Sequence, residues 1–107
     1  MYLLVFYVPV GHTEEVKNAL FAKGAGNYGL YDHCSWESIG MGQFRPLSGS
    51  HPMMRNPENV VAVVEQTRVE LIVSSNAIND VISELKKVHP YEQPVYFYWE
   101  AASFAKL

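Results

Sequence analysis

The chain has 107 residues, which is typical of one domain, and its hydrophobic fraction of 49% is enough for a core without disulfides. Its net charge is −3 and its basic residues are scattered, which argues against nucleic acid or a membrane surface as the main partner. The single cysteine cannot form an internal disulfide. The apolar segment at the N-terminus ends at Pro9 and is too short for a membrane span or a signal peptide. We therefore expect a cytoplasmic protein with one domain, residues 1–107.

The first quarter of the chain predicts a strand and then a helix. Tyr2–Val8 is apolar on both faces, which is typical of a central strand that is covered on each side. A helix is expected to begin at His12 or Thr13, with acidic residues in its first turn, where the helix dipole favours them. Gly24 and Gly26 are expected to end this helix, because glycine readily takes the left-handed conformation of a helix cap.

The middle of the chain predicts a hairpin followed by a loop. Tyr28–Glu37 is expected to be an extended strand, and a second strand around Gln43–Pro46 is expected to pair with it. Gly40 and Gly42 lie between the two and predict a bend or a bulge. Ser48–Glu58 contains one glycine and two prolines, so we expect it to be a loop and the most mobile segment of the chain.

The last part of the chain predicts a strand, a helix and a final strand. Val60–Ser74 is prone to β structure, and from Thr67 onward its residues alternate as in a sheet strand with one wetter face. The next apolar residues recur at helical spacing and predict a helix that Pro90 ends; they are Ile78, Val81, Ile82, Leu85 and Val88. Pro94–Glu100 is expected to be the closing strand.

The order of these elements is β-α-β-β-α-β, with an extra strand or an elongated hairpin in the middle. Two strand–helix–strand halves predict an α+β, ferredoxin-like sandwich, in which an antiparallel sheet carries both helices on one face. The other face of the sheet is then open. Because several strands are apolar on both faces, we expect another copy of the chain to cover that face, and hence a homo-oligomer.

Residues 24–52 and 89–94 stand out from the rest, because glycine, aromatic residues, histidine and the only cysteine are concentrated there. The segments read GAGNYGLYDHCSWESIGMGQFRPLSGSHP and HPYEQP. This linked pattern resembles the inserted middle domain of the Ngg-interacting-factor family, whose members are often labelled GTP cyclohydrolase type 2-like or dinuclear metal centre hexameric proteins. The resemblance covers nearly the whole chain.

That insert is similar to the trimeric CutA and nitrogen-regulatory PII-like fold, so the resemblance implies a PII/CutA-like domain and favours a trimer over a dimer. In full-length members, two domains that flank the insert hold the dinuclear metal. The present chain corresponds to the insert alone and lacks a His-x-His pair. We therefore expect a free-standing module without GTP cyclohydrolase activity. Where the family continues with glycine shortly after Pro52, this chain has Met53, Met54, Arg55 and Asn56.

The candidate ligand-binding residues come from the two unusual segments. They are Tyr31, His33, Trp36, Phe44, Arg45, His89, Tyr91 and Glu92. The aromatic members favour a core or a subunit interface over the alternative of a small-molecule pocket. His89 and Glu92 could exchange protons in a cleft. Alternatively they belong to a structural turn, in which His89 binds the last helix carbonyls and Glu92 pairs with Arg45 or Arg68.

The expected function is a regulatory module that binds a small ligand or a protein partner and has no catalytic residues. One alternative is a CutA-like protein that binds a divalent metal through His33, Cys34 and His89. Adjacent strand residues point to opposite faces, so His33 and Cys34 would need a ligand from elsewhere. A second alternative is a hydrolase that uses His89 and Glu92.

Overall fold

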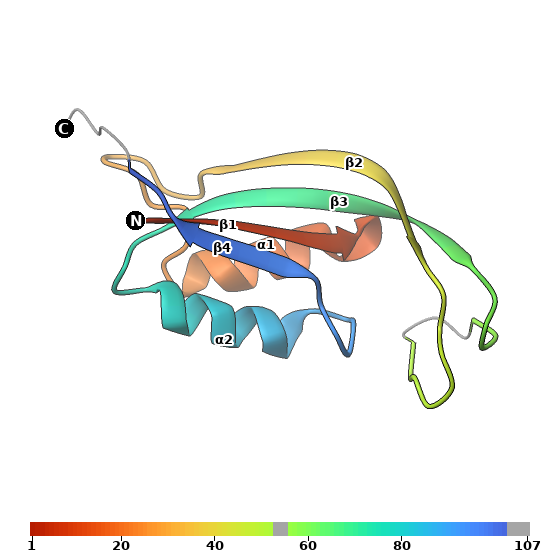
Figure 1. The fold of residues 1–107 in the computed structure, drawn as a ribbon. Helices are drawn as coiled ribbons and strands as arrows, with labels where there is room; N and C mark the ends of the chain where they lie inside the picture. The colour runs from red at the N-terminus through yellow and green to blue at the C-terminus, as the bar shows by residue number, and fades with distance from the viewer. Residues whose placement is uncertain (53–55, 103–107) are drawn as a thin grey trace.

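The computed structural model describes residues 1–52 and 56–102. Its elements are β1 (Tyr2–Pro9), the short 3-10 helix η1 (Val10–His12), α1 (Thr13–Ala22), β2 (Ser35–Phe44), β3 (Ala62–Val73), α2 (Ile78–Val88) and β4 (Tyr96–Glu100). The strands form one antiparallel sheet in the order β2-β3-β1-β4, and both helices lie on the same side of it (Figure 1). The predicted ferredoxin-like sandwich is thus confirmed. No helix in the described residues is long and apolar enough to cross a membrane.

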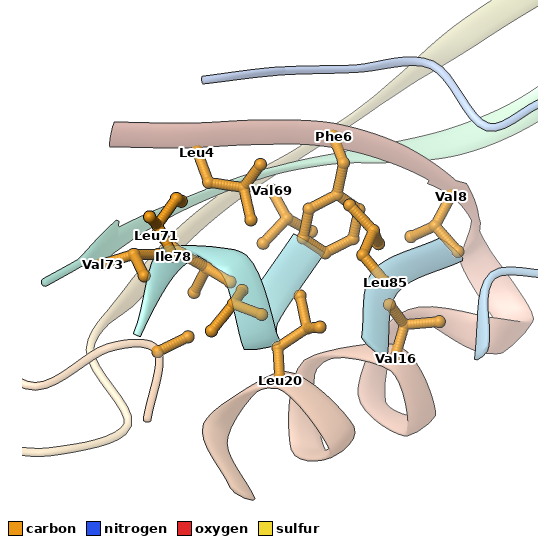
Figure 2. Packing of buried hydrophobic residues seen from close by; sticks show 12 residues of the cluster. Leu4, Phe6, Val8, Val16, Leu20, Val69, Leu71, Val73, Ile78 and Leu85 are labelled. Atoms are coloured by element: carbon orange, nitrogen blue, oxygen red, sulfur yellow. The ribbon is translucent and has the colours of Figure 1, made fainter. Parts of the chain in front are cut away.

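The core lies between the helices and the row of strand residues that faces them (Figure 2). In β1 and β3 this row consists of alternate residues, as period-2 patterning requires, and in α2 it is the predicted apolar stripe. The buried members are Leu4, Phe6, Val8, Val16, Leu20, Ala25, Val69, Leu71, Val73, Ile78, Val81 and Leu85. Phe6 extends from the central strand toward the helices, among the labelled side chains of both layers (Figure 2).

Among the residues that the structure describes, two polar side-chain contacts connect α1 to the sheet. The hydroxyl of Thr13 donates a hydrogen bond to the hydroxyl oxygen of Thr67 over 2.7 Å, and both residues are buried. Lys17 Nζ lies 2.7 Å from Glu37 Oε1 on β2. Burial of Lys17 acts to lower its pKa, but its hydrogen bond to Glu37 and the charge of that carboxylate outweigh burial, so the pKa is raised.

Strand β2 differs from the prediction. Ser35–Phe44 is one strand, and it pairs with β3 in an unbroken register from Ser35 opposite Leu71 to Phe44 opposite Ala62. The separate strand predicted around Gln43–Pro46 was therefore wrong, and so was the bulge at Gly40 and Gly42. An antiparallel ladder admits glycine in its ordinary extended conformation, so glycine alone does not identify a bulge.

The strand predicted over Tyr28–Glu37 begins only at Ser35. Upstream of it, the backbones of Tyr28 and Tyr31 exchange hydrogen bonds of 2.8 and 3.0 Å around a tight turn. Gly29 and His33 both have positive φ, 58° and 55°, which is incompatible with an extended strand. Residues 27–34 are therefore a connection at the end of the sheet that also holds the start of β1.

The elongated central hairpin consists of β2 and β3. β1 pairs with β3 only over Gln66–Val73, so Ala62–Glu65 and their partners on β2 extend beyond β1. Figure 1 shows this end of the hairpin curving past the end of the β1 ribbon, on the side where α2 ends. Residues 45–61 join the two strands there. Of the loop predicted over Ser48–Glu58, residues 53–55, including the departures Met53, Met54 and Arg55, lie outside the described residues.

Candidate functional site

A cleft of about 960 Å³ lies between the far end of the β2–β3 hairpin and the turn after α2. Residues from four parts of the chain line it: the end of β1, both hairpin strands, the segment 45–52 and residues 91–95. Four of the predicted ligand-binding residues line this cleft, namely Phe44, Arg45, Tyr91 and Glu92. The structure therefore brings the HPYE turn and the glycine-rich hairpin together around one cavity.

The floor of the cleft is formed by alternate residues of β2 and β3, which share one face of the sheet. Ser38 lies opposite Arg68 in the ladder, and Gly40 lies opposite Gln66. A Cβ atom added at Gly40 would meet nothing within 4 Å, so the backbone is bare there. A Cβ at Gly42 would collide with the amide group of Gln66, so glycine at 42 makes room for that side chain.

Side-chain contacts fix the walls of the cleft. The Nε2 of Gln66 donates a hydrogen bond of 2.9 Å to the hydroxyl oxygen of Tyr91. The ring centres of Tyr91 and Phe44 are 6.5 Å apart. Glu92 Oε1 accepts a hydrogen bond of 2.9 Å from the backbone N–H of His51. The expected pairing of Glu92 with Arg45 or Arg68 is not seen among the described residues; Glu92 instead connects the turn to the hairpin loop.

His89 lies at the base of the turn and is only 6% exposed. One ring nitrogen, Nε2, is 2.6 Å from the carbonyl oxygen of Tyr7 on β1, and the other, Nδ1, accepts the backbone N–H of Tyr91 over 3.1 Å. A carbonyl needs a donor and an N–H needs an acceptor, so these partners require the neutral ring with its proton on Nε2. The expected bond from His89 to the last helix carbonyls is made by its backbone N–H, which donates to the Leu85 carbonyl over 3.0 Å, while its ring bonds to β1.

Burial lowers the pKa of His89, and the nearby His12 acts in the same direction, while the bond to the Tyr7 carbonyl opposes them. The folded protein therefore binds a proton here less readily than the unfolded chain. The stability that this difference contributes is fully present above the ordinary histidine pKa of about 6.5 and is lost as the pH falls toward the lowered value. With both nitrogens bound to backbone, His89 has a structural role.

A substitution of His89 by glutamine should reduce the sensitivity of the fold to acid. The glutamine amide can still donate to the Tyr7 carbonyl, but it does not titrate. We expect the stability difference between wild type and His89→Gln to shift in favour of the variant as the pH falls below about 6.5. Urea unfolding at a series of pH values measures it. His51→Gln, at an exposed histidine, should follow the wild-type profile, and a His89→Gln profile parallel to wild type would contradict the assignment.

The remaining candidates lie at the opposite end of the sheet. The ring centres of His33 and Phe21 are 4.6 Å apart, and Nδ1 of His33 lies 3.2 Å from Oδ1 of Asp32. Tyr31 belongs to the tight turn before β2, and Trp36 lies on β2 opposite Glu70. Trp36 and Phe44 are eight residues apart on one strand, which is about 26 Å, so they do not form one aromatic surface.

The three predicted metal ligands do not come together within one chain. Cys34 is hydrogen-bonded through its N–H to Gly26, which itself bonds to Ile72 near the Tyr2 end of β1. His89 instead contacts Tyr7, near the other end of β1. Five residues along a strand correspond to about 17 Å. Within residues 1–52 and 56–102, no group of three or more His, Cys, Asp or Glu side chains is placed to hold a metal ion.

The cleft also contains residues that the sequence did not single out, above all Tyr7, Ser38 and Gln66, and it contains Arg68, which the sequence suggested only as a partner of Glu92. Arg68 and Gln66 lie on the face of β3 that the alternation correctly identified as wetter. The only signal in the sequence was that wetter face. It does not distinguish a residue that lines a cleft from one that is simply in solvent.

Comparison with known proteins shows close relatives that are much longer than this chain. The present chain is 38% identical over 96 residues to a protein of Halalkalibacterium halodurans named GTP cyclohydrolase 1 type 2 homolog. The matched region covers 90% of this chain and 26% of the relative. It is 40% identical over 92 residues to the Mycobacterium leprae protein of the same name, covering 86% and 24%. The chain thus spans about a quarter of these relatives. No family model matches the sequence.

Among solved structures, a Bacillus cereus protein related to NIF3 is similar with a TM-score of 0.81 and 34% identity, over 97% of this chain and 26% of that one. CutA1 of Pyrococcus horikoshii is similar with a TM-score of 0.70 over 99% of this chain and 88% of that one, but at 12% identity it shows the fold alone. The chain is therefore a homologue, with a CutA-like fold, of one segment of the GTP cyclohydrolase 1 type 2 homologues, which are related to the Ngg-interacting factor.

Proposed function

We propose that this domain is a non-catalytic module that binds a small molecule in the cleft between the β2–β3 hairpin and the turn after α2. The observation that supports it is the cleft itself, whose volume of about 960 Å³ lies in the range of small-ligand sites. Its walls combine aromatic rings from Phe44 and Tyr91 with polar groups from Ser38 and Arg68. Such a mixture of apolar surface and few oriented polar groups is typical of ligand sites.

The arrangement of His89 and Glu92 favours binding over hydrolysis. A histidine that acts as a general base needs a free ring nitrogen within reach of the substrate proton, and a carboxylate needs a free oxygen there. Both nitrogens of His89 are bound to backbone groups, and one oxygen of Glu92 is bound to the N–H of His51. GTP cyclohydrolase activity, which appears in the name of the relatives, is not part of the proposal, because the chain matches only about a quarter of those proteins.

A ligand screen by nuclear magnetic resonance tests the proposal. The purified, isotope-labelled protein is titrated with mixtures of neutral, cationic and anionic metabolites. We expect at least one mixture to shift the amide signals of residues 38–42, 66–68 and 91–93 in a saturable way. The proposal fails if no mixture shifts these signals, or if the shifts are confined to other parts of the molecule.

We also propose that the protein acts as a homo-oligomer, with a trimer expected ahead of a dimer. The support is the face of the sheet turned away from the helices, where Leu3, Val5 and Ile72 are flanked by large apolar side chains. Trp36, Phe97 and Trp99 are 56%, 57% and 46% exposed there. A face with several large exposed apolar side chains is typical of interaction surfaces.

Light scattering coupled to size-exclusion chromatography tests this association. The expected mass is three times that of the chain, and Trp36→Lys should shift it toward the monomer by placing a charge on the apolar face. Leu30→Lys is a matched control, since Leu30 is 98% exposed in the turn before β2. A wild-type mass equal to one chain would exclude the oligomer.

A further inference from the structure

The side chains that line the cleft leave it with an excess of positive charge. Two arginines, Arg45 and Arg68, and one carboxylate, Glu92, are the charged groups among its described lining residues. The Glu92 carboxylate already accepts the backbone N–H of His51 at 2.9 Å. No hydrogen bond or ion pair occupies the Arg45 side chain among the described residues. A ligand that enters the cleft therefore meets more donors than acceptors.

Arg68 is oriented by its neighbours. Its Nε lies 3.4 Å from Glu70 Oε2, its Nη1 lies 3.4 Å from the hydroxyl of Tyr7, and its guanidinium carbon is 5.9 Å from the centre of the Tyr7 ring. Nη2 has no hydrogen-bond partner among the described residues. A guanidinium held in this way offers remaining N–H groups in a planar fork, the geometry that fits the oxygens of a carboxylate or a phosphate.

The floor beside Arg68 is flat because β2 has no side chain at Gly40, and a Cβ there would stand in open space. Gly40 has no positive φ, so the local backbone does not require glycine. Val95 at the rim is 52% exposed, and the Tyr91 ring is held at one wall by Gln66. A flat apolar group can thus approach the bare strand while its charged end reaches Arg68.

We infer that the cleft binds a small organic anion, with its oxyanion on the guanidinium of Arg68 and its planar apolar body over Gly40. This inference rests on the proposed binding function and adds the chemical class of the ligand. A carboxylate and a phosphate ester share the required chemistry, so both are included in the test. Arg45, which is exposed at the cleft, adds to the attraction, but no hydrogen bond or ion pair among the described residues holds its side chain in place, so it is expected to contribute less.

The test compares four probes that share one ring and differ in their polar group: benzoate, phenyl phosphate, benzamide and benzamidinium. Each is titrated into the labelled full chain, and the amide signals of residues 38–42 and 66–68 are followed. We expect saturable shifts with benzoate or phenyl phosphate, and the stronger of the two identifies the oxyanion. Benzamide and benzamidinium should bind at least about tenfold more weakly. Benzamide offers the guanidinium one neutral acceptor oxygen and no negative charge, and benzamidinium is itself a cation without an acceptor.

Two variants test the residues. Arg68→Gln removes the charge, and Gly40→Val places a side chain on the floor, where its Cβ would meet nothing within 4 Å; each should weaken binding of the anionic probe at least about tenfold. Lys23→Gln, which removes a positive charge from the exposed end of α1, should leave it unchanged. Equal binding of benzamide or benzamidinium, or anion binding that survives Arg68→Gln, overturns the inference and leaves the binding function standing. If no probe shifts the cleft signals, the anion class is wrong, and the metabolite screen decides the function separately.

Discussion

Replacing Phe6 with alanine is expected to lower the free energy of unfolding by about 4 kcal/mol. Phe6 is 0% exposed and lies on β1, the central strand between β3 and β4. Truncation removes a buried ring and leaves a cavity between sheet and helices, which rigid elements on both sides fill poorly. This is a large fraction of the stability of a domain of this size.

Urea unfolding at a fixed chain concentration measures this loss, because association of chains would otherwise shift the apparent stability. Leu30→Ala is the control, since it also truncates an apolar side chain but at a position that is 98% exposed. We expect it to change stability by less than about 0.5 kcal/mol. A loss below about 1 kcal/mol for Phe6→Ala would mean that the core does not depend on this ring.

The fold could be predicted where the pattern is local and periodic. The stripe in α2 and the alternation in β3 each place their apolar residues on one face, and the structure buries those faces. The prediction failed at β2, because Gly40 and Gly42 suggested a break in pairing. The reason for Gly42 is the side chain of Gln66, which is distant in sequence. No local pattern contains that contact.

The candidate site could be predicted in part for the same reason. The crowding of unusual residues identified both the hairpin and the HPYE turn, and the structure places them on opposite sides of one cleft. What the sequence could not reveal is the role of each residue. Whether His89 is free to transfer protons depends on Tyr7, at the other end of the chain, whose carbonyl occupies its Nε2. His33 and Trp36 are equally unusual, yet they lie at the other end of the sheet.

Replacing Gly26 with alanine is expected to cost about 3 kcal/mol of stability, from a strained φ and a steric clash together. Gly26 has a φ of 82°, and a Cβ there would lie 2.9 Å from the Cys34 carbonyl oxygen and 2.9 Å from Phe21 Cε1. Its N–H donates to the Ile72 carbonyl over 2.7 Å, and its carbonyl accepts the N–H of Cys34 over 2.9 Å. Gly26 thus joins the segment after α1 to the end of β3 and to the start of β2.

Gly24→Ala separates the two causes. Gly24 has a φ of 100°, but a Cβ there would meet only the Cβ of Ala77, at 3.5 Å, an ordinary contact. It should therefore cost about 1 kcal/mol, the strain alone. Urea unfolding of both variants gives the difference, and equal costs would show that the Cys34 backbone can move away. Because Gly26 lies at the opposite end of the sheet from the cleft, Gly26→Ala protein that remains folded should bind the anionic probe as wild type does, which separates a loss of stability from a loss of the site.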